Sequence, residues 1–138
     1  MKDAKDLMIE NYVRYNGMIL PIVSICSPKP YNTKRFNEKW LIELLCDGLI
    51  YAPVDEVEPI PITEDILLKA GFNWNITGTA LWDSNEFLIS KDEDGYYFGV
   101  WQSSNGDEYP IFVMTLDYLH TLQNAYRLKT NKELIINF

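Results

Sequence analysis

The sequence predicts an α+β fold: an N-terminal small SH3-like β-barrel followed by an antiparallel sheet, with a short helix and a C-terminal helix packed on that sheet. Short apolar runs typical of strands recur along the 138-residue chain and are separated by turn residues. The favoured helices begin after Thr63 and after Thr115. The change from strands to helix predicts two subdomains, residues 1–62 and 63–138, packed together as one unit.

The first subdomain is predicted to consist of short strands joined by tight turns. Asn16-Gly17 between apolar runs is a strong hairpin signal, because both turn positions need positive φ. Asp47-Gly48 repeats this pattern further along the chain. Five short strands in about 55 residues favour a small closed barrel. Pro21 must then lie at an edge or a bulge, since it cannot donate to a ladder. The expected strands are 12–15, 18–23, 40–46, 49–52 and 58–60.

Residues 38–46 also allow a helix, which Asn37 would cap and Gly48 would end. The strand is favoured because Asp-Gly leads directly into another apolar run. Apolar side chains also recur at every second position of this stretch, which places them on one face of a strand. These side chains are Trp40, Ile42, Leu44 and Cys46.

The second subdomain opens with a helix signal at Thr63, a good N-cap followed by Glu64 and Asp65, which complement the helix dipole. Gly71 is placed to end this helix after about two turns. We expect its buried face to contain Ile66, Leu67 and Ala70.

An antiparallel meander is predicted next, and then a helix over 116–129. Thr115 is the expected cap of that helix, and residues 134–136 are expected to form a last strand. The meander strands are 79–82, 86–90, 96–101 and 110–114, with turns at 83–85, 92–95 and 103–107. The helix residues expected to face the sheet are Leu119, Leu122, Ala125 and Tyr126.

The net charge of −8 comes from 12 basic and 20 acidic residues. This charge argues against a nucleic-acid-binding protein that is basic over its whole surface. Most of the acidic excess lies after residue 62. The charged N-terminus does not resemble a signal peptide, and no apolar run is long enough to cross a membrane. Two cysteines, Cys26 and Cys46, do not form a disulfide framework. We expect a cytoplasmic protein with reduced thiols and no membrane partner.

Two stretches carry a family resemblance: Val57–Phe72, with Pro59-Ile60-Pro61-Ile62-Thr63-Glu64, and Tyr118–Tyr126, with His120-Thr121-Leu122-Gln123-Asn124. With Ile9–Val13 near the start and Leu128, Thr130 and Glu133-Leu134 near the end, they cover about a third of the chain. The chain resembles a family of small uncharacterised proteins of gut Bacteroidales bacteria and their phages. Members typically have leucine where Ile62 and Ala125 stand, and an aromatic residue in place of Arg127. The resemblance implies a phage, prophage or mobile-element context and no assigned chemistry.

A polar line on the C-terminal helix is one candidate site. It comprises His120, Gln123 and Arg127 at helical spacing, with Asn124 beside them. The line is a candidate recognition surface, or His120 a lone acid–base group. A structural role is favoured: polar side chains at the edge of a helix often bond neighbouring loops.

The loop at residues 29–40 is the second candidate site. It combines basic side chains, which attract the phosphates of a single-stranded nucleic acid, with aromatic side chains, on which its bases can stack. A solvated loop whose rings cover the end of the barrel is the favoured alternative, and the acidic net charge weakens attraction to phosphate. The candidate binding residues are Lys29, Tyr31, Lys34, Arg35, Phe36 and Trp40.

No metal or cofactor is expected. Asp92-Glu93-Asp94 lacks the later ligands of a calcium loop and indicates a hairpin turn. Cys26 and Cys46 have no nearby histidine or cysteine to complete a zinc site, so both are expected to be buried in the barrel.

Three functions remain open at this point. The chain contains no Gly-rich phosphate loop, no Gly-x-Ser-x-Gly and no His-Glu-x-x-His. The favoured hypothesis is therefore a non-enzymatic protein-binding or assembly module, whose partner is a protein. The alternatives are a nucleic-acid-binding accessory protein using residues 29–40, and a small enzyme with His120 as its acid–base group.

Overall fold

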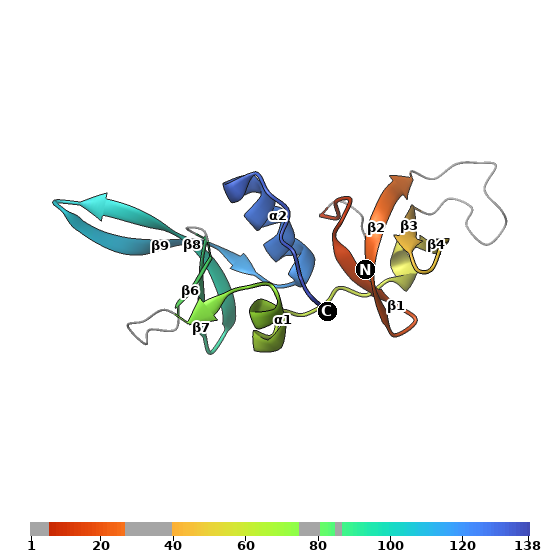
Figure 1. Ribbon diagram of the computed structural model, residues 1–138, viewed down its shortest axis with the longest axis horizontal. Coiled ribbons are helices and arrows are strands. Elements are labelled where there is room, and N and C mark those ends of the chain that lie inside the picture. Colours follow the sequence, from red (N-terminus) through yellow and green to blue (C-terminus); the bar gives the residue numbers. More distant parts are fainter. Residues whose placement is uncertain (1–5, 27–39, 75–80, 85–86) are drawn as a thin grey trace. The chain divides into compact units, whose positions relative to one another are not determined.

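The structure is a computed structural model that describes residues 6–26, 40–74, 81–84 and 87–138. It is an α+β fold with two antiparallel sheets and two α-helices, and most of its regular structure is strand (Figure 1). The chain divides into two compact units, Met1–Ile60 and Pro61–Phe138. Each unit contains one sheet and is described by itself.

Unit 1 contains a four-stranded antiparallel sheet in the order β1-β2-β3-β4. The predicted hairpins are confirmed: Asn16 and Gly17 both have positive φ, of 48° and 78°, and Asp47 and Gly48 form the second turn. Residues 41–45 are a strand and not the alternative helix. The strands are β1 (Tyr12–Tyr15), β2 (Met18–Cys26), β3 (Leu41–Leu45) and β4 (Leu49–Pro53).

Pro21 lies beside an irregularity of the sheet, as its missing N–H requires. It pairs with Tyr12 across the first hairpin, while the pairing of β2 with β3 begins only at Ile22. The register then shifts between Ile22 and Ser24. A proline at this position therefore removes no bond from the β2–β3 ladder.

The sheet of unit 1 is not closed among the residues that the structure describes, so the SH3-like barrel stays a prediction. In place of the expected strand at residues 58–60, a single bridge joins Arg14 of β1 to Glu58. The two residues exchange backbone hydrogen bonds of 2.9 and 2.8 Å. A short 3₁₀ turn, η1 (Val54–Glu56), leads from β4 toward this bridge.

One face of the sheet of unit 1 forms its hydrophobic core. The alternation along β3 directs Ile42 and Leu44 into this core, and both are fully buried. Cys46 and Ile25 pack at its margin and are only partly buried. The buried core residues are Leu7, Val13, Tyr15, Leu20, Ile22, Ile42, Leu44, Ala52, Val54 and Val57.

Unit 2 contains a five-stranded antiparallel meander in the order β5-β6-β7-β8-β9, preceded by α1 and followed by α2. The predicted meander is confirmed, with one short strand in addition, β5, which pairs with β6. The elements are α1 (Glu64–Lys69), β5 (Asn73–Trp74), β6 (Leu81–Ser84), β7 (Phe87–Asp92), β8 (Gly95–Ser104), β9 (Asp107–Leu116) and α2 (Leu119–Thr130).

The short helix α1 begins and ends as its sequence predicts. The Thr63 hydroxyl accepts a hydrogen bond from the backbone N–H of Ile66 at 3.3 Å, which satisfies a donor at the first turn. Gly71, with φ of +88°, ends the helix in the left-handed region. Ile66 and Leu67 are buried.

The C-terminal helix begins later than its capping signal indicated, so the expected start at residue 116 is wrong. Leu116 still pairs with Tyr96 in the β8–β9 ladder, and Thr115 lies in β9 and caps no helix. The N-cap of α2 is Tyr118, which makes no side-chain capping bond. Pairing of the strand therefore prevails over the local cap signal, because the ladder holds these residues extended.

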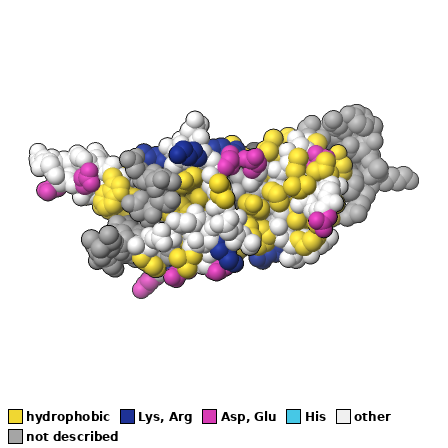
Figure 2. Space-filling model, in the orientation of Figure 1, with side chains coloured by type: hydrophobic (Ala, Val, Ile, Leu, Met, Phe, Trp, Pro, Cys, Tyr) yellow, Lys and Arg dark blue, Asp and Glu magenta, His cyan; other side chains and the backbone are white. Residues whose placement is uncertain are grey.

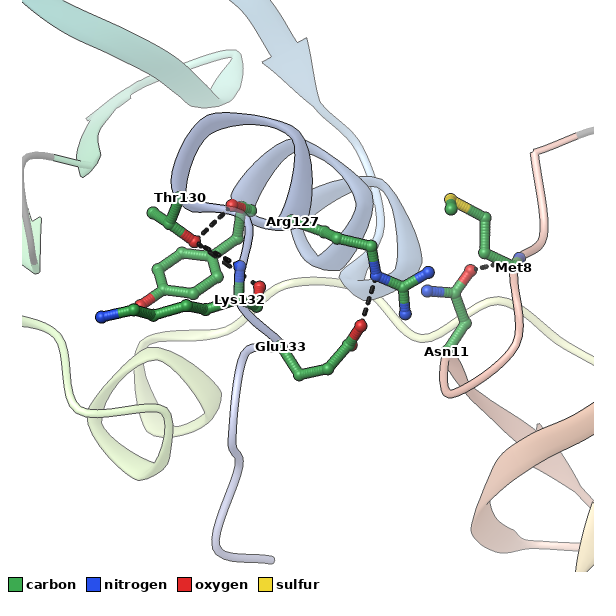
Figure 3. Close-up of polar contacts among 7 residues, drawn as sticks. Met8, Asn11, Arg127, Thr130, Lys132 and Glu133 are labelled. Atoms are coloured by element: carbon green, nitrogen blue, oxygen red, sulfur yellow. Dashed lines mark hydrogen bonds and ion pairs between the residues drawn. The ribbon is translucent and has the colours of Figure 1, made fainter.

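Residues 134–136 form no strand, so this expectation is also wrong. They follow α2 in an extended conformation, with Leu134 and Ile136 buried and Ile135 exposed. An ion pair between Arg127 and Glu133 fastens this segment to α2 (Figure 3). Thr130 adds to the turn: its hydroxyl donates to the Tyr126 carbonyl and accepts from the Lys132 N–H.

A cluster of aromatic rings lies in the core of unit 2. The ring of Phe87 stacks on that of Phe98 at 4.4 Å between centroids and contacts Tyr126 of α2 at 5.4 Å. Phe72, just after α1, meets both Phe87 and Tyr126. These contacts join both helices to the sheet. The inward-facing residues predicted for α2 are all buried: Leu119, Leu122, Ala125 and Tyr126.

Candidate functional site

The basic and aromatic loop lies mostly outside the described residues. Of its six candidate binding residues, Lys29, Tyr31, Lys34, Arg35 and Phe36 fall in the undescribed segment 27–39. Trp40 is described: it directly precedes β3, its carbonyl accepts from the Val54 N–H, and its side chain is exposed. An interface at this loop therefore stays a prediction.

The polar line of α2 is largely buried. His120 is 5% exposed and its ring stacks on that of Tyr118 at 5.7 Å, while Gln123 is also buried. Asn124 and Arg127 are partly exposed. An imidazole so enclosed is hard for a substrate to reach, which favours the structural interpretation. A recognition or acid–base role for this line stays a prediction.

The acidic turn at residues 92–95 makes the hydrogen bonds of a hairpin turn. The Asp92 carboxylate accepts from the backbone N–H groups of Asp94 and Gly95, at 2.8 and 3.1 Å. Within the described ranges, no group of three histidine, cysteine, aspartate or glutamate side chains is placed to hold a metal ion. Cys26 and Cys46 are free thiols, and both are partly rather than fully buried.

The outer face of the β3–β4 hairpin carries a cluster of exposed apolar side chains. Leu45 pairs with Leu49, and Glu43 pairs with Tyr51, so all four side chains lie on the same face. Leu45, Leu49 and Tyr51 are 50%, 55% and 52% exposed. We call these four residues the hairpin face. Figure 2 shows that hydrophobic side chains reach the surface in both units.

Glu43 is the polar centre of the hairpin face. Its carboxylate accepts a hydrogen bond from the Ser24 hydroxyl of the neighbouring strand at 2.9 Å. The Glu43 carboxylate also raises the pKa of Tyr51, through side-chain hydrogen bonding and through its negative charge. Glu43 is therefore bonded to Ser24 and electrostatically coupled to Tyr51.

A two-stranded arm is the most distinctive feature of unit 2. β7 pairs with β8 only from Gly95 to Gly99, whereas β8 pairs with β9 as far as Ser104. Residues 100–111 therefore form a ribbon to which no other described strand is paired, and Figure 1 shows it extending beyond the rest of the sheet. Asn105 and Gly106, both with positive φ, make the turn at its tip. We call residues 100–111 the arm.

One face of the arm lines a cavity. Trp101 and Ser103 lie on one face of β8, and Glu108, which pairs with Ser103, lies on the same face. With Lys129 of α2, these side chains line an open cavity of about 400 Å³. The cavity combines an indole ring, a hydroxyl, a carboxylate and an ammonium group. We call it the arm cavity.

The arm and its cavity were missed at the sequence level. The polar cluster at residues 103–107 predicts a five-residue turn, but only Asn105 and Gly106 turn the chain, and the strands continue on both sides. Asn-Gly at the centre of this cluster was the available signal, because it favours a two-residue hairpin turn. That Lys129 lies near the arm depends on tertiary packing and has no sequence signal.

Comparisons of the chain with protein-family models, with curated proteins and with solved structures find no match. None of the described helices is long and apolar enough to span a membrane.

Proposed function

We propose that this chain is a non-enzymatic protein-binding or assembly module of phage or mobile-element type, and that it binds its partner through the hairpin face. The observation that carries this proposal is the contiguity of Leu45, Leu49 and Tyr51 on two paired strands, each at least half exposed. Exposed apolar side chains are common singly, but a contiguous cluster around a polar centre is typical of an interaction surface.

The side chains of the hairpin face indicate which chemical groups a partner must present. Each Å² of apolar surface that a partner covers contributes about 25 cal/mol, so Leu45 and Leu49 favour an apolar counterpart. Glu43 already accepts a hydrogen bond from Ser24, and a carboxylate has room for more donors. The partner is therefore a protein surface with apolar side chains and a hydrogen-bond donor positioned for Glu43.

The architecture of unit 1 suits such a role. Among the described strands of unit 1, β4 is the last in the sheet, so Leu49 and Tyr51 lie at its edge. The small SH3-like barrel remains our proposal for the complete unit, supported by the bridge between Arg14 and Glu58 across the other edge strand. The phage or mobile-element context is supported by the resemblance of residues 57–72 and 118–126 described above.

Affinity capture with matched variants tests the proposal. The immobilised chain is incubated with nuclease-treated lysate of the source cell, and the retained proteins are quantified by mass spectrometry. We expect one protein to be retained by the parent chain and lost with Leu45→Ser/Leu49→Ser. Nuclease treatment separates this outcome from capture through nucleic acid.

Leu128→Ser is the matched control, because Leu128 is 86% exposed and lies on α2 in the other unit. It removes an exposed leucine without touching the hairpin face, so the captured protein should be retained. Circular dichroism of each variant establishes that the fold is kept. Equal retention by the hairpin variant and the parent chain would show that the partner binds elsewhere.

A further inference from the structure

The arm cavity presents four chemically different groups to one volume. Trp101 contributes an indole that is 40% exposed, Ser103 a hydroxyl, Glu108 a carboxylate and Lys129 an ammonium group. Its volume of about 400 Å³ lies in the range of roughly 300–1,000 Å³ that is typical of small-molecule sites. Such sites combine aromatic side chains with a few polar groups that orient the ligand, and in this cavity three polar groups surround a single indole ring.

Among the described residues, the charged groups of the cavity have no ion-pair partner. Neither Glu108 nor Lys129 forms an ion pair with another residue of the described ranges. Their charges are opposite, so the lining of the cavity carries no net charge. A phosphate or another anion would be repelled by Glu108 and by the net charge of −8, and a polyamine would be repelled by Lys129. A ligand without net charge is therefore favoured.

Two classes of uncharged ligand remain, zwitterions and polyols, and the openness of the site separates them. Ion pairs in contact with solvent contribute little to affinity, so the two charges alone would hold a zwitterion weakly. The indole face of Trp101 contributes to affinity through the apolar area that a ligand buries on it. All three polar groups can bond hydroxyls: Glu108 accepts, Lys129 donates and Ser103 does both. A pyranose has a C–H face for the ring and hydroxyls around its rim.

We propose that the arm cavity binds a neutral saccharide, whose C–H face stacks on Trp101 and whose hydroxyl groups bond Glu108, Ser103 and Lys129. This binding activity goes beyond the proposed protein-binding function. It uses unit 2, whereas the hairpin face belongs to unit 1, so either activity can fail while the other stands.

The test uses saturation-transfer NMR and calorimetry on the full chain, with defined ligands at about 10 mM, which detects millimolar dissociation constants. The saccharides are glucose, galactose, mannose, N-acetylglucosamine and disaccharides of each. L-Phenylalanine represents zwitterions and inorganic phosphate represents anions. We expect at least one saccharide to bind, with its ring protons saturated, and neither phenylalanine nor phosphate to bind.

Trp101→Ala should lower the affinity for that saccharide at least about tenfold, and Glu108→Gln about threefold. Trp74→Ala is the matched control: Trp74 belongs to the same unit, is 44% exposed and does not line the cavity, so the affinity should stay within about twofold. Trp101→Phe keeps an aromatic face and should retain part of the affinity. Circular dichroism identifies any variant that has lost its fold.

Three results would overturn the proposal. The first is that no saccharide binds the parent chain. The second is that saccharide binding survives Trp101→Ala, or is lost equally with Trp74→Ala. The third is binding of phenylalanine that is lost with Glu108→Gln, while the saccharides do not bind, because the cavity would then be a zwitterion site.

Discussion

At the scale of single residues, Glu43 controls the chemistry of the hairpin face. It accepts a hydrogen bond from Ser24 and raises the pKa of Tyr51, and these two residues come from the strands on either side of its own. Side-chain hydrogen bonding and the carboxylate charge both favour the neutral phenol, so the pKa of Tyr51 is raised above its usual value near 10.

Glu43→Gln should lower the pKa of Tyr51 toward its usual value, because it removes the charge and weakens the acceptor. A raised folded-state pKa stabilises the fold below the unfolded value and loses that effect as the pH rises through the folded pKa. Because the variant brings the folded and unfolded pKa values closer together, this contribution should be smaller in it than in the parent chain. NMR titration of the tyrosine ring carbons measures the change. Tyr97, whose pKa is raised by burial and then by Asp92, is the internal control and should not respond.

His120 is the residue for which a structural role can be separated from a functional one. Because it is buried and stacks on Tyr118, His120→Ala should leave a cavity and destabilise the fold by about 2 kcal/mol. A thermal melt should show a lower Tm, while Leu128→Ala, on the exposed side of the same helix, should leave it unchanged. An unchanged melting curve for His120→Ala would contradict the structural interpretation.

At the scale of elements, α1 and α2 begin in different ways. The cap of α1 is a side-chain bond from Thr63, whereas α2 begins at Tyr118 without one. Local sequence therefore determines the start of α1, while the end of the β8–β9 ladder determines the start of α2. The start of α1 could therefore be predicted from the local sequence, whereas the start of α2 could not.

Thr63→Ala should destabilise unit 2 by about 1 kcal/mol, because the Ile66 N–H loses its acceptor. Thr63→Ser should keep most of the stability, since its hydroxyl can make the same bond. Thr115→Ala serves as the control: Thr115 is an exposed residue of β9, so its loss should change stability by less than about 0.5 kcal/mol. Urea unfolding compares the three variants. A larger effect at Thr115 than at Thr63 would contradict this assignment of the caps.

The root of the arm depends on Gly99. A Cβ at this position would lie 2.6 and 2.8 Å from two atoms of the Phe112 ring and 2.9 Å from the Ile111 carbonyl oxygen. Gly99→Ala should therefore destabilise unit 2 by about 1–3 kcal/mol in urea unfolding, whereas Ser103→Ala on the same strand should not. Phe112→Ala should destabilise the Gly99→Ala variant less than it destabilises the parent chain, because it removes the ring that the new Cβ contacts. A wild-type midpoint for Gly99→Ala would contradict this close packing.

Local patterns predicted most elements of the fold. Asn16-Gly17 and Asp47-Gly48 specify hairpins by positive φ, and Thr63 with Gly71 bounds α1. Pairing over longer distances was not predictable. β5 has only two residues, too few for a period-two pattern, and Leu134–Ile136 alternates like a strand but pairs with none of the described strands.

The candidate sites were less predictable than the fold. His120 and Gln123 were recognised by their spacing, yet spacing does not tell a buried helix edge from an exposed one. The hairpin face needs the register of β3 with β4, which pairs Leu45 with Leu49. The arm cavity needs the approach of Lys129 to Trp101, residues on separate elements.

At the scale of the whole molecule, the negative charge is distributed unevenly along the sequence. Most of the net charge of −8 lies in the second half of the sequence, and the acidic pair Asp107-Glu108 stands near the tip of the arm. Figure 2 shows acidic side chains at that end of the view. The proposed protein-binding surface lies in the less acidic first half, where contacts are governed by apolar area and by Glu43.

Hydrogen–deuterium exchange of the chain with and without the captured partner tests the hairpin face most directly. We predict that protection on binding is concentrated in peptides covering residues 41–53, where β3 and β4 carry Leu45, Leu49 and Tyr51. Protection confined to the arm, residues 100–111, or to α2, with the β3–β4 peptides unchanged, would contradict the claim that this chain binds its partner through the hairpin face.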